Sequence, residues 1–183
     1  MHETTTVGII LTAGKATRFK VSDRNKTASL LRGKPLVQYG DHLMHYTPDL
    51  MQKIIAKHQA MQATVTLVAA RFDQPDALAW GRIITNEEGA VQAIIEQKDA
   101  SPEERQVTLL NAGFYCSEYE FLTQAIHQLE PSVTTGEYYV TDIIGMAVAT
   151  QKTVACYEVP LAAVDSGVNT TEQLAAIENI SID

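Results

Sequence analysis

The sequence is poor in cysteine and in positive charge. Its 183 residues include only two cysteines, Cys116 and Cys156, which lie far apart and form no Cys-x-x-Cys pair. That count excludes a disulfide framework and a cysteine-rich zinc site, and it favours a cytoplasmic location. Fourteen Lys and Arg residues against twenty-two Asp and Glu residues give a formal charge of −8. Proteins that bind nucleic acids or anionic membranes are normally basic, so neither kind of partner is expected.

Long apolar runs are also missing. No stretch approaches the roughly 18 residues that span a bilayer, so no membrane-spanning helix is expected. The short run Val7–Leu11 has no positively charged segment before it, and we expect a buried strand there rather than a signal peptide. The length and the apolar fraction of 45% predict one globular domain over residues 1–183. An acidic domain can still bind a phosphorylated ligand, but only through a compact local site of basic side chains or backbone N–H groups.

Strand and helix patterns alternate along the chain. Strands are expected at Val7–Leu11, Thr64–Ala70, Gly81–Ile84, Val91–Glu96, Val107–Tyr115 and Thr153–Val159. Helices are expected after Thr47, after the capping box Ser101–Glu104, over Glu118–Glu130, along the apolar stripe Val140–Val148, and over Thr170–Ile180. Apolar runs without alternation are typical of parallel strands that are buried on both faces. We therefore predict an α/β fold with a mostly parallel, Rossmann-like sheet and an inserted hairpin.

The loop after the first strand is a candidate phosphate site. Open α/β sheets bind ligands at the carboxyl ends of their strands. Leu11-Thr12-Ala13-Gly14 lies at such an end, where small residues let backbone N–H groups approach a phosphate, and Lys15, Arg18 and Lys26 add positive charge. The spacing from Gly8 to Gly14 does not fit a Walker A loop, and the dinucleotide fingerprint lacks its second glycine. On the loop alone, a phosphate site and an ordinary strand-to-helix turn are equally compatible with the residues.

A series of ordered motifs resembles the sugar-nucleotide pyrophosphorylases. The loop Leu11–Arg18 is similar to their glycine-rich signature and is followed, as in that family, by Lys26 and Gly33-Lys34-Pro35. The later motifs come in the family's order: Tyr39-Gly40-Asp41, Ala79–Ile83, Ile94–Ala100, Asn111-Ala112-Gly113, Gly136–Asp142 and Gly167-Val168-Asn169. They look like the uridyltransferase domain of the bifunctional bacterial enzymes that make UDP-N-acetylglucosamine. The strings E-x-K-D-A and G-E-Y-Y-x-T-D are fairly specific to that branch.

The resemblance implies a nucleotidyltransferase fold and a reaction. A phosphate oxygen of N-acetylglucosamine-1-phosphate would attack the α-phosphorus of UTP, giving UDP-N-acetylglucosamine and pyrophosphate. Such a displacement needs alignment and charge stabilisation rather than a covalent nucleophile. By resemblance, Arg18 and Lys26 are catalytic, and Asp41 and Asn169 hold one Mg²⁺. The substrate-binding residues implied are Leu11, Ala13, Gly14, Tyr39, Gly40, Gly81, Glu96, Asn111 and Asn169, of which Gly81, Glu96 and Asn111 would bind the sugar.

Each of these residues also has an ordinary structural interpretation. A glutamate that ends a strand, such as Glu96, is most often a solvated carboxylate. Asn111 could be a bulge residue, and Asn169 could belong to a helix N-cap. His42, His45 and His58 are a weak zinc pattern, because histidines at i and i+3 need a third ligand motif.

The chain departs from the family between Gln38 and Tyr39. Family members carry a long segment there, about two strand–helix units, with the residues that read uracil. We expect a real internal deletion at 38/39, a shortened sheet, and no acetyltransferase domain. Two alternatives therefore stay open: a truncated, catalytically impaired sugar-nucleotide-binding module, or a pyrophosphorylase for another nucleotide or sugar. Base specificity and oligomeric state are left open by the sequence.

Overall fold

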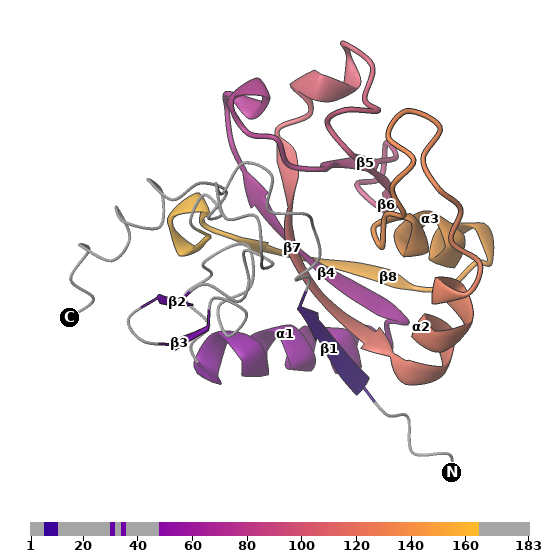
Figure 1. Cartoon of the computed structure of the whole chain (residues 1–183). Helices are drawn as coiled ribbons and strands as arrows, with labels where there is room; N and C mark the ends of the chain where they lie inside the picture. Colours follow the sequence, from indigo (N-terminus) through magenta and orange to yellow (C-terminus); the bar gives the residue numbers. More distant parts are fainter. Residues whose placement is uncertain (1–5, 11–29, 32–33, 36–47, 165–183) are drawn as a thin grey trace.

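The computed structural model describes residues 6–10, 30–31, 34–35 and 48–164, and their main feature is a six-stranded sheet (Figure 1). Its strands are β1 (Thr6–Ile10), β4 (Val65–Arg71), β5 (Arg82–Thr85), β6 (Val91–Ile95), β7 (Leu109–Glu118) and β8 (Val154–Val159). The strand order is β6-β5-β7-β4-β8, and β1 pairs with β7 beside this path. The short strands β2 (Leu30–Leu31) and β3 (Lys34–Pro35) form a separate antiparallel pair.

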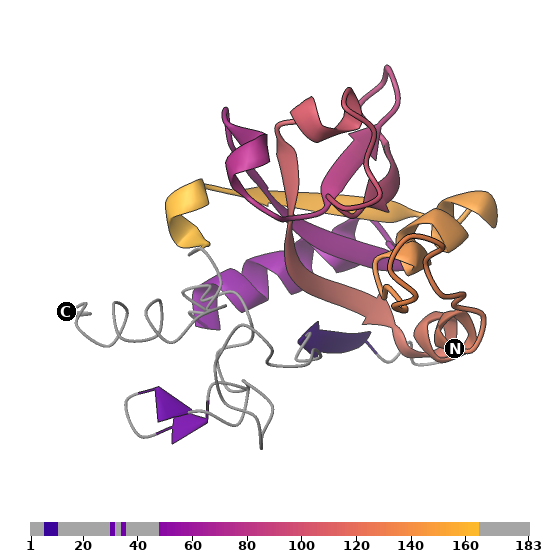
Figure 2. The same ribbon diagram turned by 45° about the horizontal axis from the view of Figure 1, so that its top comes forward.

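Helices cover both faces of the sheet. Helix α1 (Pro48–Ala60) packs on one face, where its Ile54 joins a core with Val68, Leu110 and Phe114. Helices α2 (Tyr119–Ile126) and α3 (Asp142–Ala149) pack on the other face. In Figure 2 the β5–β6 hairpin and its flanking loops project from the sheet on the side away from α1. The result is a three-layer α/β arrangement, as expected.

Strand β4 shows why the sequence lacks alternation. Its residues Val65, Leu67 and Ala69 face α2 and α3, whereas Val68 and Ala70 face α1. Successive side chains of a strand point to opposite faces, so a strand between two helical layers is apolar throughout. His58 in α1 is also buried, and its Nδ1 is hydrogen-bonded to Thr66 Oγ1 at 2.9 Å. The histidine therefore joins α1 to the sheet.

The expectation of a mostly parallel sheet is wrong. Among the strands described, only β4 and β8 pair in parallel, whereas β1–β7, β4–β7, β5–β6 and β5–β7 are all antiparallel. The first strand, expected to be central and parallel, pairs antiparallel with β7, from Thr6 opposite Glu118 to Ile10 opposite Phe114. The physical reason is that an unbroken apolar run reports burial on both faces, and burial does not set strand direction.

The predictions of the hairpin and of the capping box are confirmed by the structure. The expected hairpin is formed by β5 and β6, and Asn86 Oδ1 accepts hydrogen bonds from the backbone N–H groups of Glu88 and Ala90 in its turn. The capping box is present: Ser101 N donates to Glu104 Oε2 at 2.7 Å, and Glu104 N donates to Ser101 Oγ at 3.2 Å. It opens only the short 3-10 helix η4 (Glu104–Gln106).

Two further 3-10 helices, η3 (Pro75–Ala77) and η5 (Leu161–Ala163), complete the described elements. The helix expected over Glu118–Glu130 ends earlier, at Ile126. Thr47 and the helix expected at Thr170–Ile180 lie outside the described residues. No helix in the described part of the chain is long and apolar enough to cross a membrane.

Candidate functional site

Gly81, Glu96 and Asn111 are brought together by three adjacent strands. Gly81 directly precedes β5, Glu96 directly follows β6, and Asn111 lies in β7. Because β5 pairs with both β6 and β7, the three positions meet at one end of the hairpin. The Asn111 backbone N–H donates to the Gly81 carbonyl at 2.8 Å. The residues implied by resemblance to bind the sugar therefore form one cluster.

The glycine at position 81 keeps this cluster open. A Cβ atom there would lie 2.7 Å from Ile94 Cγ2, 3.4 Å from Glu96 Oε1 and 3.6 Å from Asn111 Cβ. The first distance is shorter than van der Waals contact allows, and the branched Ile94 side chain has little freedom to move away. Any larger side chain would also fill the space between the carboxylate and the amide.

Asn111 sits at a bulge in β7. Leu67 pairs with Tyr115 and Ala69 with Asn111, so β7 holds extra residues where β4 has only Val68 between the two pairs. Gly113 within the bulge has φ +75°, and its N–H donates to Asn111 Oδ1 at 3.1 Å. Bulges re-aim side chains next to binding sites. Asn111 is thus a bulge residue and a member of the cluster at once, and it is 7% exposed.

Glu96 is half-buried and hydrogen-bonded, unlike an ordinary solvated carboxylate. Thr141, which is buried just before α3, donates from Oγ1 to Glu96 Oε1 at 3.0 Å. Burial raises the pKa of Glu96, the Thr141 hydroxyl opposes that rise, and the nearby carboxylates Asp142 and Asp99 add to it. A carboxylate beside a neutral amide suits a ligand that carries hydroxyl groups.

Arg82 is a structural residue of the site to which the sequence analysis gave no role. Its guanidinium is fully buried and donates to the carbonyl oxygens of Pro75 (2.9 Å), Leu78 (3.0 Å), Trp80 and Arg105 (3.4 Å). It also pairs with Asp76 Oδ1 at 3.4 Å. Burial lowers the pKa of Arg82, against the attraction of Asp76. Loops on both sides of the hairpin are held around this one cation, next to Gly81.

Thr141 is the second residue that was missed. The signal for it was the G-E-Y-Y-x-T-D string, which was recognised as a motif without a role for its threonine. For Arg82 the signal was the motif Ala79–Ile83, which was recognised without a role for its arginine. The Thr141–Glu96 bond joins residues 45 positions apart, and the bonds of Arg82 to the irregular loops on both sides of the hairpin reach up to 23 positions away, so no local sequence pattern predicts either partner set.

The other predicted site residues lie outside the described residues. They are Leu11, Ala13, Gly14, Arg18, Lys26, Tyr39, Gly40, Asp41 and Asn169, and the 38/39 junction lies there too. Their placement stays a prediction. Within the described ranges, no group of three or more His, Cys, Asp and Glu side chains is arranged to hold a metal ion. The expected Mg²⁺ ligands, Asp41 and Asn169, are not among those ranges.

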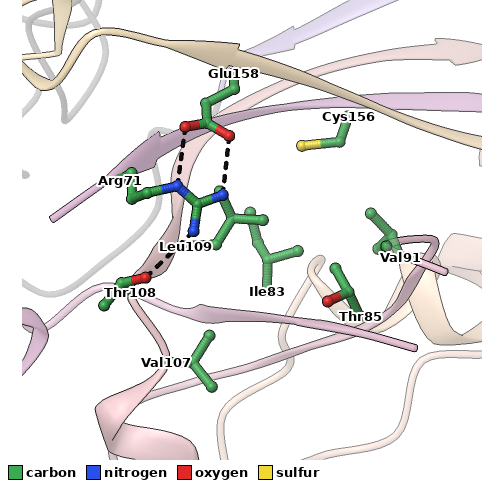
Figure 3. Close-up of a pocket in the computed structure, with 10 residues that line it drawn as sticks. Arg71, Ile83, Thr85, Val91, Val107, Thr108, Leu109, Cys156 and Glu158 are labelled. Atoms are coloured by element: carbon green, nitrogen blue, oxygen red, sulfur yellow. Dashed lines mark hydrogen bonds and ion pairs between the residues drawn. The ribbon is translucent and has the colours of Figure 1, made fainter. Parts of the chain in front are cut away.

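A separate cavity of about 300 Å³ lies at the carboxyl ends of the parallel strands β4 and β8 (Figure 3). Arg71 pairs with Glu158 through two bonds of 3.1 Å and donates to Thr108 Oγ1 at 3.3 Å along one wall. Ile83, Val91 and other apolar side chains line the rest. Gly81, Glu96 and Asn111 are not among the described residues that line this cavity, so it is distinct from the Gly81–Glu96–Asn111 cluster.

Comparison with known proteins assigns the chain to a class. A sequence profile described as nucleotidyl transferase matches residues 25–163, and the chain belongs to the nucleotidyl transferase family. Its fold is similar to that of apo UDP-glucose pyrophosphorylase, with a TM-score of 0.54 and 17% identity over 76% of this chain and 50% of that one.

Closer relatives confirm the resemblance found in the motifs. The chain is 43% identical to the bifunctional protein GlmU of Trichlorobacter lovleyi over 119 residues, which are 65% of this chain and 25% of that protein. It is 33% identical to the GlmU of Geobacillus thermodenitrificans over 153 residues, 84% of this chain and 33% of that protein. In these alignments the chain covers only a quarter to a third of the length of its curated relatives.

Proposed function

We propose that this protein is a Mg²⁺-dependent uridylyltransferase acting in the cytoplasm. It would join UTP and N-acetylglucosamine-1-phosphate to give UDP-N-acetylglucosamine and pyrophosphate. The observation that carries the proposal is the meeting of Gly81, Glu96 and Asn111 at one end of the β5–β6 hairpin. These three residues come from separate motifs of the family, and they form one cluster in the fold.

The cluster has the chemistry that a sugar requires. Glu96 accepts hydrogen bonds and is held on one side by Thr141, so its second oxygen can accept from a sugar hydroxyl. Asn111 has a side-chain amide that can donate to a hydroxyl or acetamido oxygen. Gly81 leaves space for the ring between them. The supporting strands and the buried Arg82 fix these groups on a rigid frame.

The phosphate and metal end of the site is proposed from the motifs alone. Arg18 and Lys26 would bind the triphosphate, and the backbone of Leu11, Ala13 and Gly14 would contact the nucleotide. Tyr39 and Gly40 would lie beside the ligand. Asp41 and Asn169 would hold Mg²⁺, which neutralises phosphate charge when bound.

The test is pyrophosphate release from a panel of nucleoside triphosphates and sugar-1-phosphates, with and without Mg²⁺. We expect the highest rate with UTP and N-acetylglucosamine-1-phosphate, and we expect that rate to depend on Mg²⁺ and to be lost in Asp41→Ala. Equal turnover of glucose-1-phosphate would refute the sugar assignment. Sugar-phosphate binding without turnover of any pair would identify the impaired binding module that a deletion at 38/39 would produce.

A further inference from the structure

Tyr115 carries a buried hydroxyl group that the fold does not use. The side chain is 0% exposed, in the core between the sheet and helices α2 and α3. Its hydroxyl has no hydrogen-bond partner among the residues that the structure describes. An unpaired hydroxyl in apolar surroundings destabilises a fold, and phenylalanine would fill the same space without that cost. The hydroxyl therefore calls for a role other than packing.

The neighbours of this hydroxyl belong to the proposed sugar site. Tyr115 and Asn111 flank the bulge of β7, and Asn111 lies between Leu110 and Ala112, which face the opposite side of the sheet. Burial raises the pKa of Tyr115, the nearby Asn111 side chain opposes that rise, and the negative charge of Glu96 adds to it. Tyr115 and Asn111 pair with Leu67 and Ala69, which lie in the same core cluster, so both side chains are on one face of the sheet. The hydroxyl is near Asn111 and Glu96 and has no hydrogen-bond partner among the described residues.

The side-chain amide of Asn111 is hydrogen-bonded to the backbone of the bulge. Its Oδ1 accepts from the Gly113 N–H at 3.1 Å, so the amide oxygen is engaged. An Nδ2 group has two N–H donors. If one donates to the Tyr115 hydroxyl, the other has a single fixed direction and can donate to an oxygen of the ligand. Asn111 then acts as a hydrogen-bond donor beside Glu96, which acts as an acceptor.

We propose that Tyr115 is a positioning residue that fixes the Asn111 amide when a sugar phosphate is bound. The hydroxyl pairs with Asn111 Nδ2 in the bound state and sets the amide as a donor toward the sugar. This inference rests on the proposed function, since it assumes that the cluster binds a sugar phosphate. It extends that function by assigning a specificity role to a residue that does not touch the ligand.

The experiment measures affinity for N-acetylglucosamine-1-phosphate by calorimetry in the full chain and in Tyr115→Phe. We expect about tenfold weaker binding in the variant, the effect of one hydrogen bond, with a thermal midpoint that is unchanged or higher. Tyr157→Phe, on the opposite side of the sheet, is the matched control and should bind normally. In an Asn111→Ala background, Tyr115→Phe should cause no further loss, because the two residues act as a unit.

The outcomes separate the two proposals. If the full chain binds the sugar phosphate and Tyr115→Phe binds equally well, the positioning role is refuted and the proposed function stands. An additive loss in the double variant would likewise refute it, because it would show that Tyr115 acts without Asn111. If the full chain itself fails to bind the sugar phosphate, the proposed function and the inference that rests on it both fail.

Discussion

Glu96 shows how the setting of one residue decides between two interpretations. In the sequence it is a glutamate at the end of a strand, and such carboxylates are usually exposed to solvent. In the fold it is half-buried, bonded to Thr141 and close to Asp142 and Asp99. Burial raises its pKa, so the folded state disfavours the charged form. Such a group is retained at a cost in stability, which fits a binding role.

The charge of Glu96 should therefore make stability depend on pH. Its folded pKa lies above the ordinary value of 4.5. The folded state favours the protonated carboxyl of Glu96. The free energy of unfolding that this protonated group contributes is therefore fully present below pH 4.5 and is lost as the pH rises through the raised pKa. We predict that Glu96→Gln unfolds at a higher urea concentration than the parent protein at pH 7 and that this difference shrinks toward pH 4. The matched control is Glu87→Gln, at the exposed turn of the hairpin. A constant difference at both pH values would contradict the prediction.

For single residues, the family motifs predicted the members of the cluster, which the chemistry of each residue alone could not do. Gly81, Glu96 and Asn111 were grouped because they occur in family strings, and the fold places them together. The bond from Thr141 to Glu96 and the unpaired Tyr115 hydroxyl escaped prediction. Both depend on tertiary packing between segments that are distant in sequence, and no local pattern reports that packing.

The β5–β6 hairpin is the element that carries the site, and Arg82 holds its base. The guanidinium is buried among carbonyl oxygens of the loops before β5 and after β6. Removing it would leave those carbonyls without donors inside the fold, and a lysine could not reproduce the planar fork.

We predict that Arg82→Lys lowers the free energy of unfolding by about 3 kcal/mol or more. Arg71→Lys is the matched control, because Arg71 pairs with Glu158 at the surface with 53% of its side chain exposed. Exposed pairs contribute at most about 1 kcal/mol, so this variant should unfold almost like the parent. Urea denaturation followed by circular dichroism measures both, and equal losses in the two variants would contradict the role given to Arg82.

Elements were easier to predict than their arrangement. The hairpin, the capping box and the apolar stripe of α3 were all found from local patterns. Strand direction was not, because an apolar run carries no information on direction, and β1 and β7 pair antiparallel. The bulge at Asn111 interrupts the pairing with β4 but does not end the strand, which runs on to Glu118.

At the scale of the whole molecule, the sheet separates two environments. Helix α1 packs on one face of the sheet, and the hydrogen bond between His58 and Thr66 joins the helix to the sheet. On the other face α3 presents its N-terminal end to the hairpin, and Thr141 reaches Glu96 from there. The family and the fold follow from the matches over most of the chain, whereas the particular substrates stay proposals.

The most direct test of the account is the affinity of Gly81→Ala for N-acetylglucosamine-1-phosphate. Gly145→Ala is the matched control, since a Cβ atom at that position in α3 meets nothing within 4 Å. We predict that Gly145→Ala binds like the parent protein and that Gly81→Ala, although folded, loses at least about tenfold in affinity, because the new methyl group enters the space between Glu96 and Asn111. Unchanged binding by a folded Gly81→Ala would show that the sugar does not occupy this cluster.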